Sequence, residues 1–142
     1  MASHYDEKKK CRVGIMDEAQ FHAETDQPNG AYFKTLLKTW QRSGGTLKWG
    51  AGGVGLRSQV GGKEAGICFV APAYAGKKNR IEVSLTVLAK QVGAARSKKL
   101  KAGLQEAASD NLKGTSMVSI LDPGTLAASA RKKLTTTLCE LI

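Results

Sequence analysis

The sequence predicts an α+β protein with two layers, in which a mainly antiparallel sheet of roughly four to five strands, arranged as a meander, packs against about three helices. Two observations support this prediction. Residues 43–88 alternate short β-type segments with glycine-rich turns, and these connections are too short for the crossovers that parallel strands require. Apolar residues at helical spacing precede and follow that region.

Residues 1–16 lack apolar periodicity, so we predict a flexible N-terminal tail there, or a short strand at Cys11–Met16. Residues 17–142 are predicted to form a single α+β domain, which at this length can bury a core without disulfides or metal. Residues 17–29 are rich in charge and end at a Pro-Asn-Gly breaker, which indicates a loop or one short helical turn.

A helix is predicted from Ala31 to the glycine pair at 44–45. Four apolar residues recur there at i, i+3, i+4 and i+7: Phe33, Leu36, Leu37 and Trp40. This spacing forms one apolar stripe, and glycine just past the last periodic residue typically ends a helix. The aromatic side chains of the stripe need a broad apolar surface to pack on, such as one face of a sheet.

Four strands are predicted after this helix, at 47–49, 54–59, 67–70 and 80–87. The segment 67–70 is almost wholly apolar, which indicates a central strand. In 80–87 apolar and polar residues alternate, which is typical of a strand with one wet face.

The C-terminal third predicts a helix over about 94–112, a strand at 117–121, and a final helix that runs to the end of the chain. Asp122 is the predicted N-cap of this last helix, and Pro123 its first residue.

Residues 50–55 match G-x-G-x-x-G, the glycine pattern of dinucleotide-binding loops. In such loops a helix must follow, because its N-terminus holds the pyrophosphate, and an acidic residue lies ~20 positions further on. Here a β-like segment follows and a new turn begins within seven residues. We therefore predict that these glycines form a hairpin turn, and the sequence predicts no cofactor.

The net charge of +10 and the pI near 9.7 are the compositional outliers. Residues 1–30 sum to −2, with four basic and six acidic side chains, so residues 31–142 carry +12. A segment this basic attracts polyanions such as DNA or RNA. The expected function is therefore a non-enzymatic binding module for nucleic acid or another polyanion.

The residues predicted to bind nucleic acid are cations that could share the wet sheet face or its turns, with one tyrosine as a stacking group: Lys48, Arg57, Lys63, Tyr74, Lys77, Lys78 and Arg80. Two further basic clusters, at 96–101 and 131–133, fall on predicted helices, where a run of charge most often forms a solvated face.

One alternative is a protein-interaction or small-ligand module, with a pocket near Trp49, Phe69 and Tyr74. A metal-dependent nuclease that uses Glu64 and Glu82 is a distant third, because the Glu-x-Lys of such sites is missing.

The three scattered cysteines and two histidines lack zinc-site spacing, so no metal site is predicted and Cys68 is expected to be a buried thiol. No apolar segment approaches the ~20 residues of a membrane span, and the N-terminus lacks an apolar signal region. These features predict a cytoplasmic protein with no membrane association.

Overall fold

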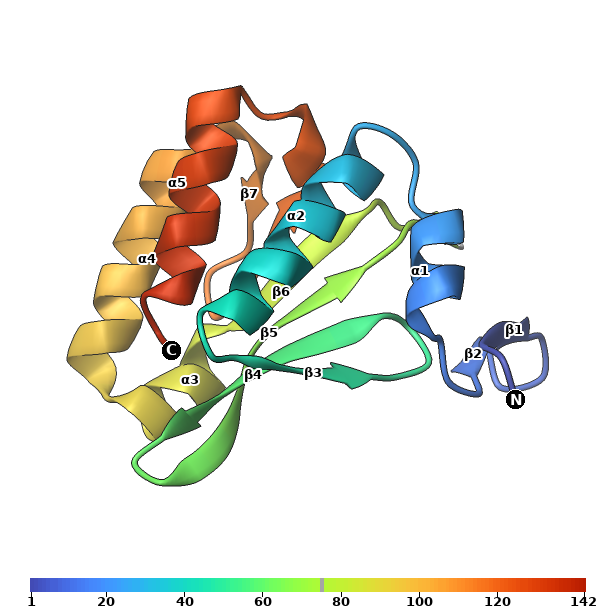
Figure 1. The fold of residues 1–142 in the computed structure, drawn as a ribbon, viewed down its shortest axis with the longest axis horizontal. Helices are drawn as coiled ribbons and strands as arrows, with labels where there is room; N and C mark the ends of the chain where they lie inside the picture. Colours follow the sequence, from blue (N-terminus) through green and yellow to red (C-terminus); the bar gives the residue numbers. More distant parts are fainter. Residues whose placement is uncertain (75) are drawn as a thin grey trace.

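A computed structural model describes residues 1–74 and 76–142 (Figure 1). Over these residues the protein is α+β, with five α-helices, a six-stranded antiparallel sheet and a separate two-stranded sheet. The predicted class is confirmed, but the predicted numbers of strands and helices are too low.

The large sheet has the strand order β3-β4-β5-β6-β8-β7, and every neighbouring pair is antiparallel. The first four strands follow chain order, so the predicted meander is confirmed for them. The strands are β3 Thr46–Trp49, β4 Val54–Val60, β5 Lys63–Ala71, β6 Arg80–Ser84, β7 Leu112–Lys113 and β8 Met117–Leu121.

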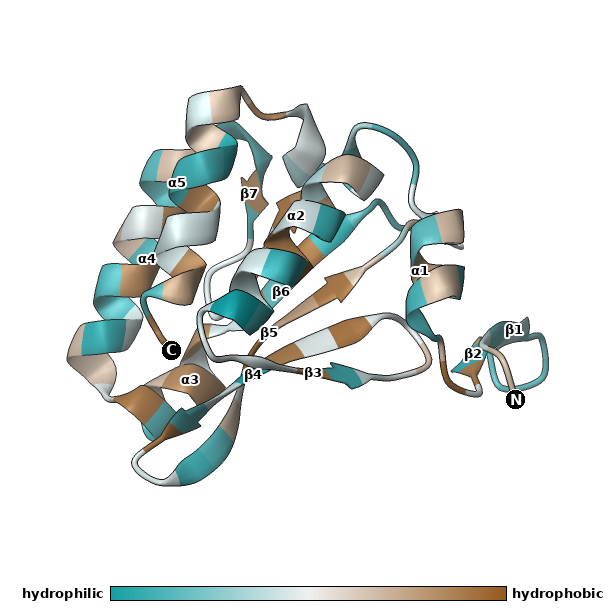
Figure 2. Ribbon diagram, in the orientation of Figure 1, coloured by the Kyte–Doolittle hydropathy of each residue, from teal (hydrophilic) through white to brown (hydrophobic). Residues whose placement is uncertain are grey.

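Three long helices lie side by side on one face of this sheet: α2 Asn29–Arg42, α4 Ala94–Ala108 and α5 Ala128–Cys139 (Figure 1). Figure 2 shows that the strands of the sheet contain many apolar residues and that apolar and polar residues are interspersed along the helices that cover it. The predicted stripe of α2 supplies Phe33, Leu37 and Trp40 to this core, where they are fully buried with residues such as Leu56 and Leu134.

The opposite sheet face is covered by none of these three helices. The strand registers align one row of residues across that face: Lys48, Gly55, Phe69, Glu82 and Ser119. These residues are half-buried or exposed, whereas their apolar neighbours along β4, β5, β6 and β8 are buried. We call this surface the open sheet face.

The strand predicted at 80–87 is too long, because β6 ends at Ser84 and the helix α3, Leu85–Val92, follows at once. The Ser84 side chain caps α3 by accepting a hydrogen bond from the backbone N–H of Val87. Leu85 and Leu88 are buried whereas Val87 is 51% exposed. The alternation of apolar and polar residues thus extends past the end of β6 into α3, where burial follows helical spacing instead.

Two other boundaries also differ from the prediction. Helix α4 ends at Ala108 rather than near 112, and a 3-10 turn, Ser109–Asn111, leads into β7. Asp122 does not cap the last helix, because it adopts a left-handed conformation with φ of 46° and Pro123–Thr125 form a separate 3-10 turn. Helix α5 begins only at Ala128.

The glycines at 50–53 connect β3 to its antiparallel neighbour β4, so the predicted hairpin connection is confirmed. Gly53 has a φ of 153°, and a Cβ atom there would collide with the carbonyl oxygen of Val70 on β5. Close packing against β5 thus requires glycine at this position.

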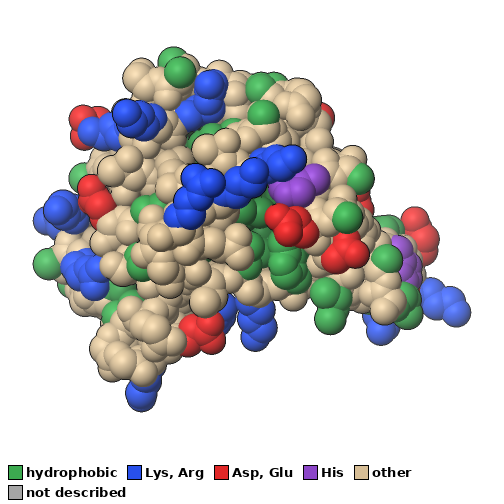
Figure 3. All heavy atoms as spheres, viewed as in Figure 1, with side chains coloured by type: hydrophobic (Ala, Val, Ile, Leu, Met, Phe, Trp, Pro, Cys, Tyr) green, Lys and Arg blue, Asp and Glu red, His purple; other side chains and the backbone are tan. Residues whose placement is uncertain are grey.

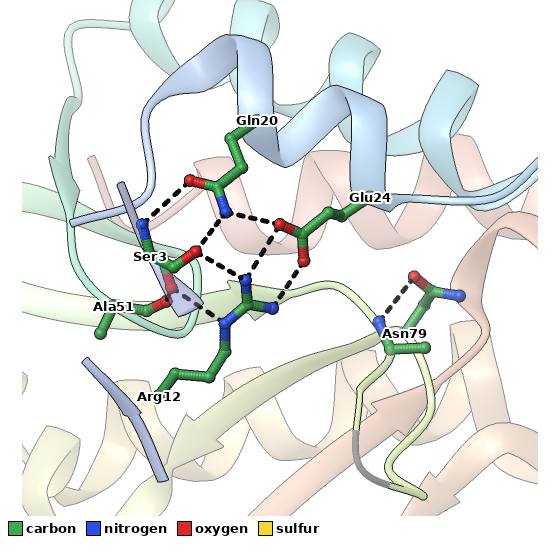
Figure 4. A network of polar contacts seen from close by, with 7 residues as sticks. Ser3, Arg12, Gln20, Glu24, Ala51 and Asn79 are labelled. Atoms are coloured by element: carbon green, nitrogen blue, oxygen red, sulfur yellow. Dashed lines mark hydrogen bonds and ion pairs between the residues drawn. The ribbon is translucent and has the colours of Figure 1, made fainter. Parts of the chain in front are cut away.

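Residues 1–24 pack at one end of the sheet. They form the strands β1 His4–Asp6 and β2 Cys11–Val13 and the short helix α1 Glu18–Glu24. Figure 4 shows the polar contacts that hold them together. The Arg12 guanidinium donates to both carboxylate oxygens of Glu24, at 2.6 and 2.9 Å, and its Nε donates to the Ser3 hydroxyl at 2.9 Å. The Ser3 hydroxyl donates in turn to the Ala51 carbonyl, which links this segment to the β3–β4 turn.

No helix in the described part of the chain is long and apolar enough to span a membrane.

Candidate functional site

Three of the predicted nucleic-acid-binding residues share the open sheet face. Lys48 is exposed on β3, whereas Arg57 on β4 and Arg80 on β6 are engaged in ion pairs. Arg57 Nε lies 3.5 Å from Glu64 Oε1, and Arg80 Nε donates to Glu82 Oε1 at 3.1 Å. The Arg80 side chain is only 10% exposed. These two guanidinium charges are therefore balanced within the sheet.

The predicted lysines lie at two distant places. Lys63 begins β5, while Lys77 and Lys78 follow its far end, so roughly 25 Å of strand separates them. All three are exposed. The Nζ atom of Lys78 lies 3.8 Å from a carboxylate oxygen of Asp122, which offsets part of its charge.

Tyr74, the predicted stacking residue, is half-buried and already has aromatic and cationic neighbours. The Arg12 guanidinium carbon lies 5.2 Å from the centre of the Tyr74 ring, and the Tyr5 ring centre lies 6.4 Å away. Arg12 thus covers one face of the ring, by a cation–π contact that stabilises the N-terminal segment.

The predicted pocket near Trp49, Phe69 and Tyr74 is wrong. Trp49 lies on the helix-covered face of the sheet, where its ring packs edge-on against Phe21 at 5.6 Å. Phe69 projects from the open sheet face, because it pairs with Gly55 and Glu82 in the same row. Two side chains on opposite faces of one sheet cannot line a common pocket.

The two glutamates of the nuclease alternative are engaged in ion pairs, and the Cys68 thiol is buried. Glu64 and Glu82 each pair with an arginine, and the described residues contain no group of three or more His, Cys, Asp or Glu side chains that could hold a metal ion. Cys68 is buried, as predicted, and burial raises the pKa of its thiol. A protonated buried thiol is a poor nucleophile.

The helix layer is the more strongly basic part of the molecule. Helices α2, α4 and α5 together carry one acidic residue, Glu106, and ten Lys and Arg residues. The basic residues are Lys34, Lys38 and Arg42 on α2, Arg96, Lys98, Lys99 and Lys101 on α4, and Arg131, Lys132 and Lys133 on α5. Glu106 pairs with Lys133 at 2.7 Å. Figure 3 shows a row of Lys and Arg side chains along α2 and others over α4 and α5.

A groove of about 550 Å³ lies between α2 and α5 in this layer. Its walls are mostly small side chains, and the charged residues among the described lining residues, Arg131 and Lys132, are both basic. The lining consists of Pro28, Ala31, Tyr32, Thr35 and Thr39 from the α2 side, Gly124 from the turn before α5, and Ala128, Arg131, Lys132, Thr135 and Thr136 from α5. We call this cavity the α2–α5 groove.

The floor of the α2–α5 groove is closed by a hydrogen bond between the two helices. The hydroxyl oxygens of Tyr32 and Thr135 lie 3.1 Å apart. Burial raises the pKa of the Tyr32 phenol, which therefore stays neutral and can donate. The floor carries no ionised group of its own.

One end of the groove is held by a buried clamp between the start of α2 and the turn before α5. Asn29, only 3% exposed, accepts a hydrogen bond from the backbone N–H of Gly124 at 2.8 Å. A Cβ atom at Gly124 would lie 2.6 Å from the Asn29 backbone, so only glycine permits this approach. The Asn29 amide also donates to Asp26 at 3.2 Å and to Asp122 at 3.4 Å.

The sequence pattern did not predict this groove. The available signal is the series of small residues Ala31, Thr35 and Thr39, which follow one another at four-residue spacing beside the apolar stripe of α2. Nothing in the pattern indicates that α5, some 90 positions later, would lie against that series.

Comparison of the chain with family models, curated proteins and solved structures finds no match. The function is therefore inferred from geometry and charge.

Proposed function

We propose that the protein is a binding module for nucleic acid or another polyanion, and that the helix layer makes most of the contacts. The observation that carries this proposal is the ratio of ten basic residues to one acidic residue on α2, α4 and α5. We define the basic helix surface by the exposed cations on these three helices, which are Lys34, Lys38, Arg42, Arg96, Lys98, Lys99, Lys132 and Lys133.

Clustered cations repel each other, so their accumulation on adjacent helices lowers the stability of the free protein. On α4 this cost is larger, because Arg96 and Lys99 lie in the N-terminal half, where the helix dipole disfavours positive charge. A bound polyanion would remove both penalties and would release its own condensed counterions. The charge distribution is thus better suited to the bound state than to the free one.

The expected contacts are with phosphates rather than with bases. The aromatic residues of α2, including Tyr32 and Trp40, are buried. A nucleic acid base bound at the basic helix surface therefore could not stack on them. Lysine and arginine contacts to phosphate oxygens position a protein on a nucleic acid but read no sequence. We therefore expect binding with little sequence preference and a strong dependence on salt.

Fluorescence anisotropy with labelled single- and double-stranded DNA and RNA tests this proposal, from low to physiological salt and with heparin as competitor. The test variant reverses three exposed cations of α2: Lys34→Glu, Lys38→Glu and Arg42→Glu. The control variant makes the same change of charge in three exposed lysines of the predicted sheet and loop set: Lys48→Glu, Lys63→Glu and Lys77→Glu.

We expect the α2 variant to bind more weakly and to show a shallower salt slope, by ~0.9 for each phosphate of duplex DNA that the variant no longer neutralises. The control variant should retain most of the affinity. An equal loss in both variants would mean that binding follows net charge alone. A loss confined to the control variant would instead favour the residues predicted from the sequence.

A second candidate function is a small-ligand or protein-interaction module, and the observation that favours it is the α2–α5 groove. Its volume lies within the range of ~300–1,000 Å³ that is typical of ligand pockets. Affinity for nucleic acid that disappears at modest salt and does not exceed that for heparin would favour this candidate.

A further inference from the structure

The two ends of the α2–α5 groove differ in charge. Arg131 and Lys132 lie one turn into α5, and the Arg131 guanidinium reaches back to the carbonyls of Gly124 and Leu126, which precede the helix at the end of the groove where α2 begins. The other end is lined by Thr39, three turns into α2, and by Thr136, and no charged residue lines it. A ligand that follows the groove would therefore meet positive charge at one end only.

The walls of the groove have few hydrogen-bond donors to offer. Thr35 and Thr39 donate their hydroxyl protons to carbonyls four residues earlier in α2, at 3.2 and 2.9 Å. Thr135 makes the same contact within α5, with the Arg131 carbonyl at 3.1 Å. With their hydroxyl protons already used, these side chains contribute mainly methyl groups. Sugars and nucleosides, which need several polar partners, are poorly matched to such walls.

The charged end of the groove is preorganised. One terminal nitrogen of Arg131 donates to the Leu126 carbonyl at 2.6 Å, which fixes the position of the guanidinium group. A guanidinium has five N–H donors, so others remain for an anionic group of a ligand. Lys132 is exposed beside it, and no acidic side chain lines the groove to compete for either cation.

We propose that the α2–α5 groove binds a single-chain anionic amphiphile, such as a medium-chain carboxylate, as a free molecule. The carboxylate lies at Arg131 and Lys132, and the alkyl chain extends along Ala31, Thr35 and Thr39. These three residues span about 12 Å of helix, at ~1.5 Å per residue, which suits a chain of moderate length. This site goes beyond the proposed polyanion binding, because it depends on the apolar walls as well as on charge.

Isothermal titration calorimetry of the full chain with sodium decanoate tests the proposal, together with amide chemical shifts recorded during the same titration. We expect saturable binding, with shifts confined to α2, α5 and the turn at Gly124. Hexanoate should bind more weakly, because it covers less of the apolar wall, and decyltrimethylammonium should not bind. Equal binding of the cationic and anionic ten-carbon probes, or decanoate binding that does not saturate, would overturn the proposal.

Two substitutions at exposed positions separate the alkyl wall from the charged end. Thr35→Trp fills the groove and should abolish decanoate binding, whereas Gln41→Trp places the same side chain on α2 outside the groove and should leave it unchanged. Lys132→Glu should weaken binding roughly five- to tenfold, and Lys98→Glu, outside the groove, should have little effect. Unchanged affinity in Thr35→Trp would refute the site.

The same variants distinguish a free amphiphile from other anionic partners. If vesicles of anionic phospholipid bind wild type and Thr35→Trp equally while decanoate does not bind, the basic surface acts on membranes and the proposal fails. Thr35→Trp leaves the charge unchanged, so it should bind nucleic acid like wild type. The charge-reversed α2 variant should retain decanoate binding, which keeps the two proposals separately testable.

Discussion

The buried clamp between Asn29 and Gly124 joins segments that are 95 residues apart in the sequence, and Asn29→Ala removes it. The Asn29 oxygen is the acceptor for a backbone N–H that is buried, so the substitution leaves that donor unpaired. An orphaned buried donor costs about 1–3 kcal/mol. The contacts of the Asn29 amide with Asp26 and Asp122 are longer and add less. We therefore expect a loss of about 2–3 kcal/mol in the free energy of unfolding.

Urea denaturation followed by tryptophan fluorescence measures this loss, because Trp40 on α2 is buried in the core. With an m-value of about 2 kcal/mol/M, the midpoint should fall by about 1 M or more while m stays unchanged. Gln105→Ala, at an exposed position of α4, is the control and should change stability by less than ~0.5 kcal/mol. An Asn29→Ala midpoint within ~0.2 M of wild type would refute the view that this clamp holds α5 against α2.

Three further outcomes are expected. Trp40→Phe removes an indole N–H that donates to two backbone carbonyls, at 3.1 and 3.0 Å, and thermal melts should show a loss of ~1–2 kcal/mol in stability. The hydrogen bonds from Arg12 hold the pKa of Glu24 below its ordinary value of 4.5, so the stability that this pair contributes is present above that pH and is lost as the pH falls below it. Unfolding of Glu24→Gln should therefore depend less on pH in the acid range, and a pH dependence equal to that of wild type would contradict the ion pair. In thiol-labelling kinetics, exposed Cys11 should react at once and buried Cys68 only on the timescale of unfolding; fast labelling of Cys68 would show that β5 opens locally.

Local patterns in the sequence predicted the elements whose burial follows one simple period. The stripe of α2 is an example, because all four of its apolar residues are buried on the sheet. The β6–α3 boundary was missed because Leu85 satisfies both the period of the strand and that of the following helix. Only tertiary packing, which exposes Val87 and buries Leu88, distinguishes the two.

The electrostatics of the sheet could not be predicted, because they depend on register. Arg57 pairs with Glu64, seven positions later, across the β4–β5 hairpin. Arg80 pairs with Glu82, two positions later on the same strand. Local patterns in the sequence show the charge of each of these residues but do not show which residues lie beside them in space. The α2–α5 groove was hidden for a related reason, since it exists only where two distant helices meet.

The order of the large sheet has a consequence for how this protein behaves at high concentration. Its two outer strands, β3 and β7, are only four and two residues long, and each carries an exposed lysine, Lys48 or Lys113. Short, charged border strands offer few free backbone groups to a second chain, which disfavours strand-by-strand addition and the fibres that it can produce. Both edges of the sheet are thus protected against the addition of strands from other molecules, which disfavours self-association through a continuous β-sheet.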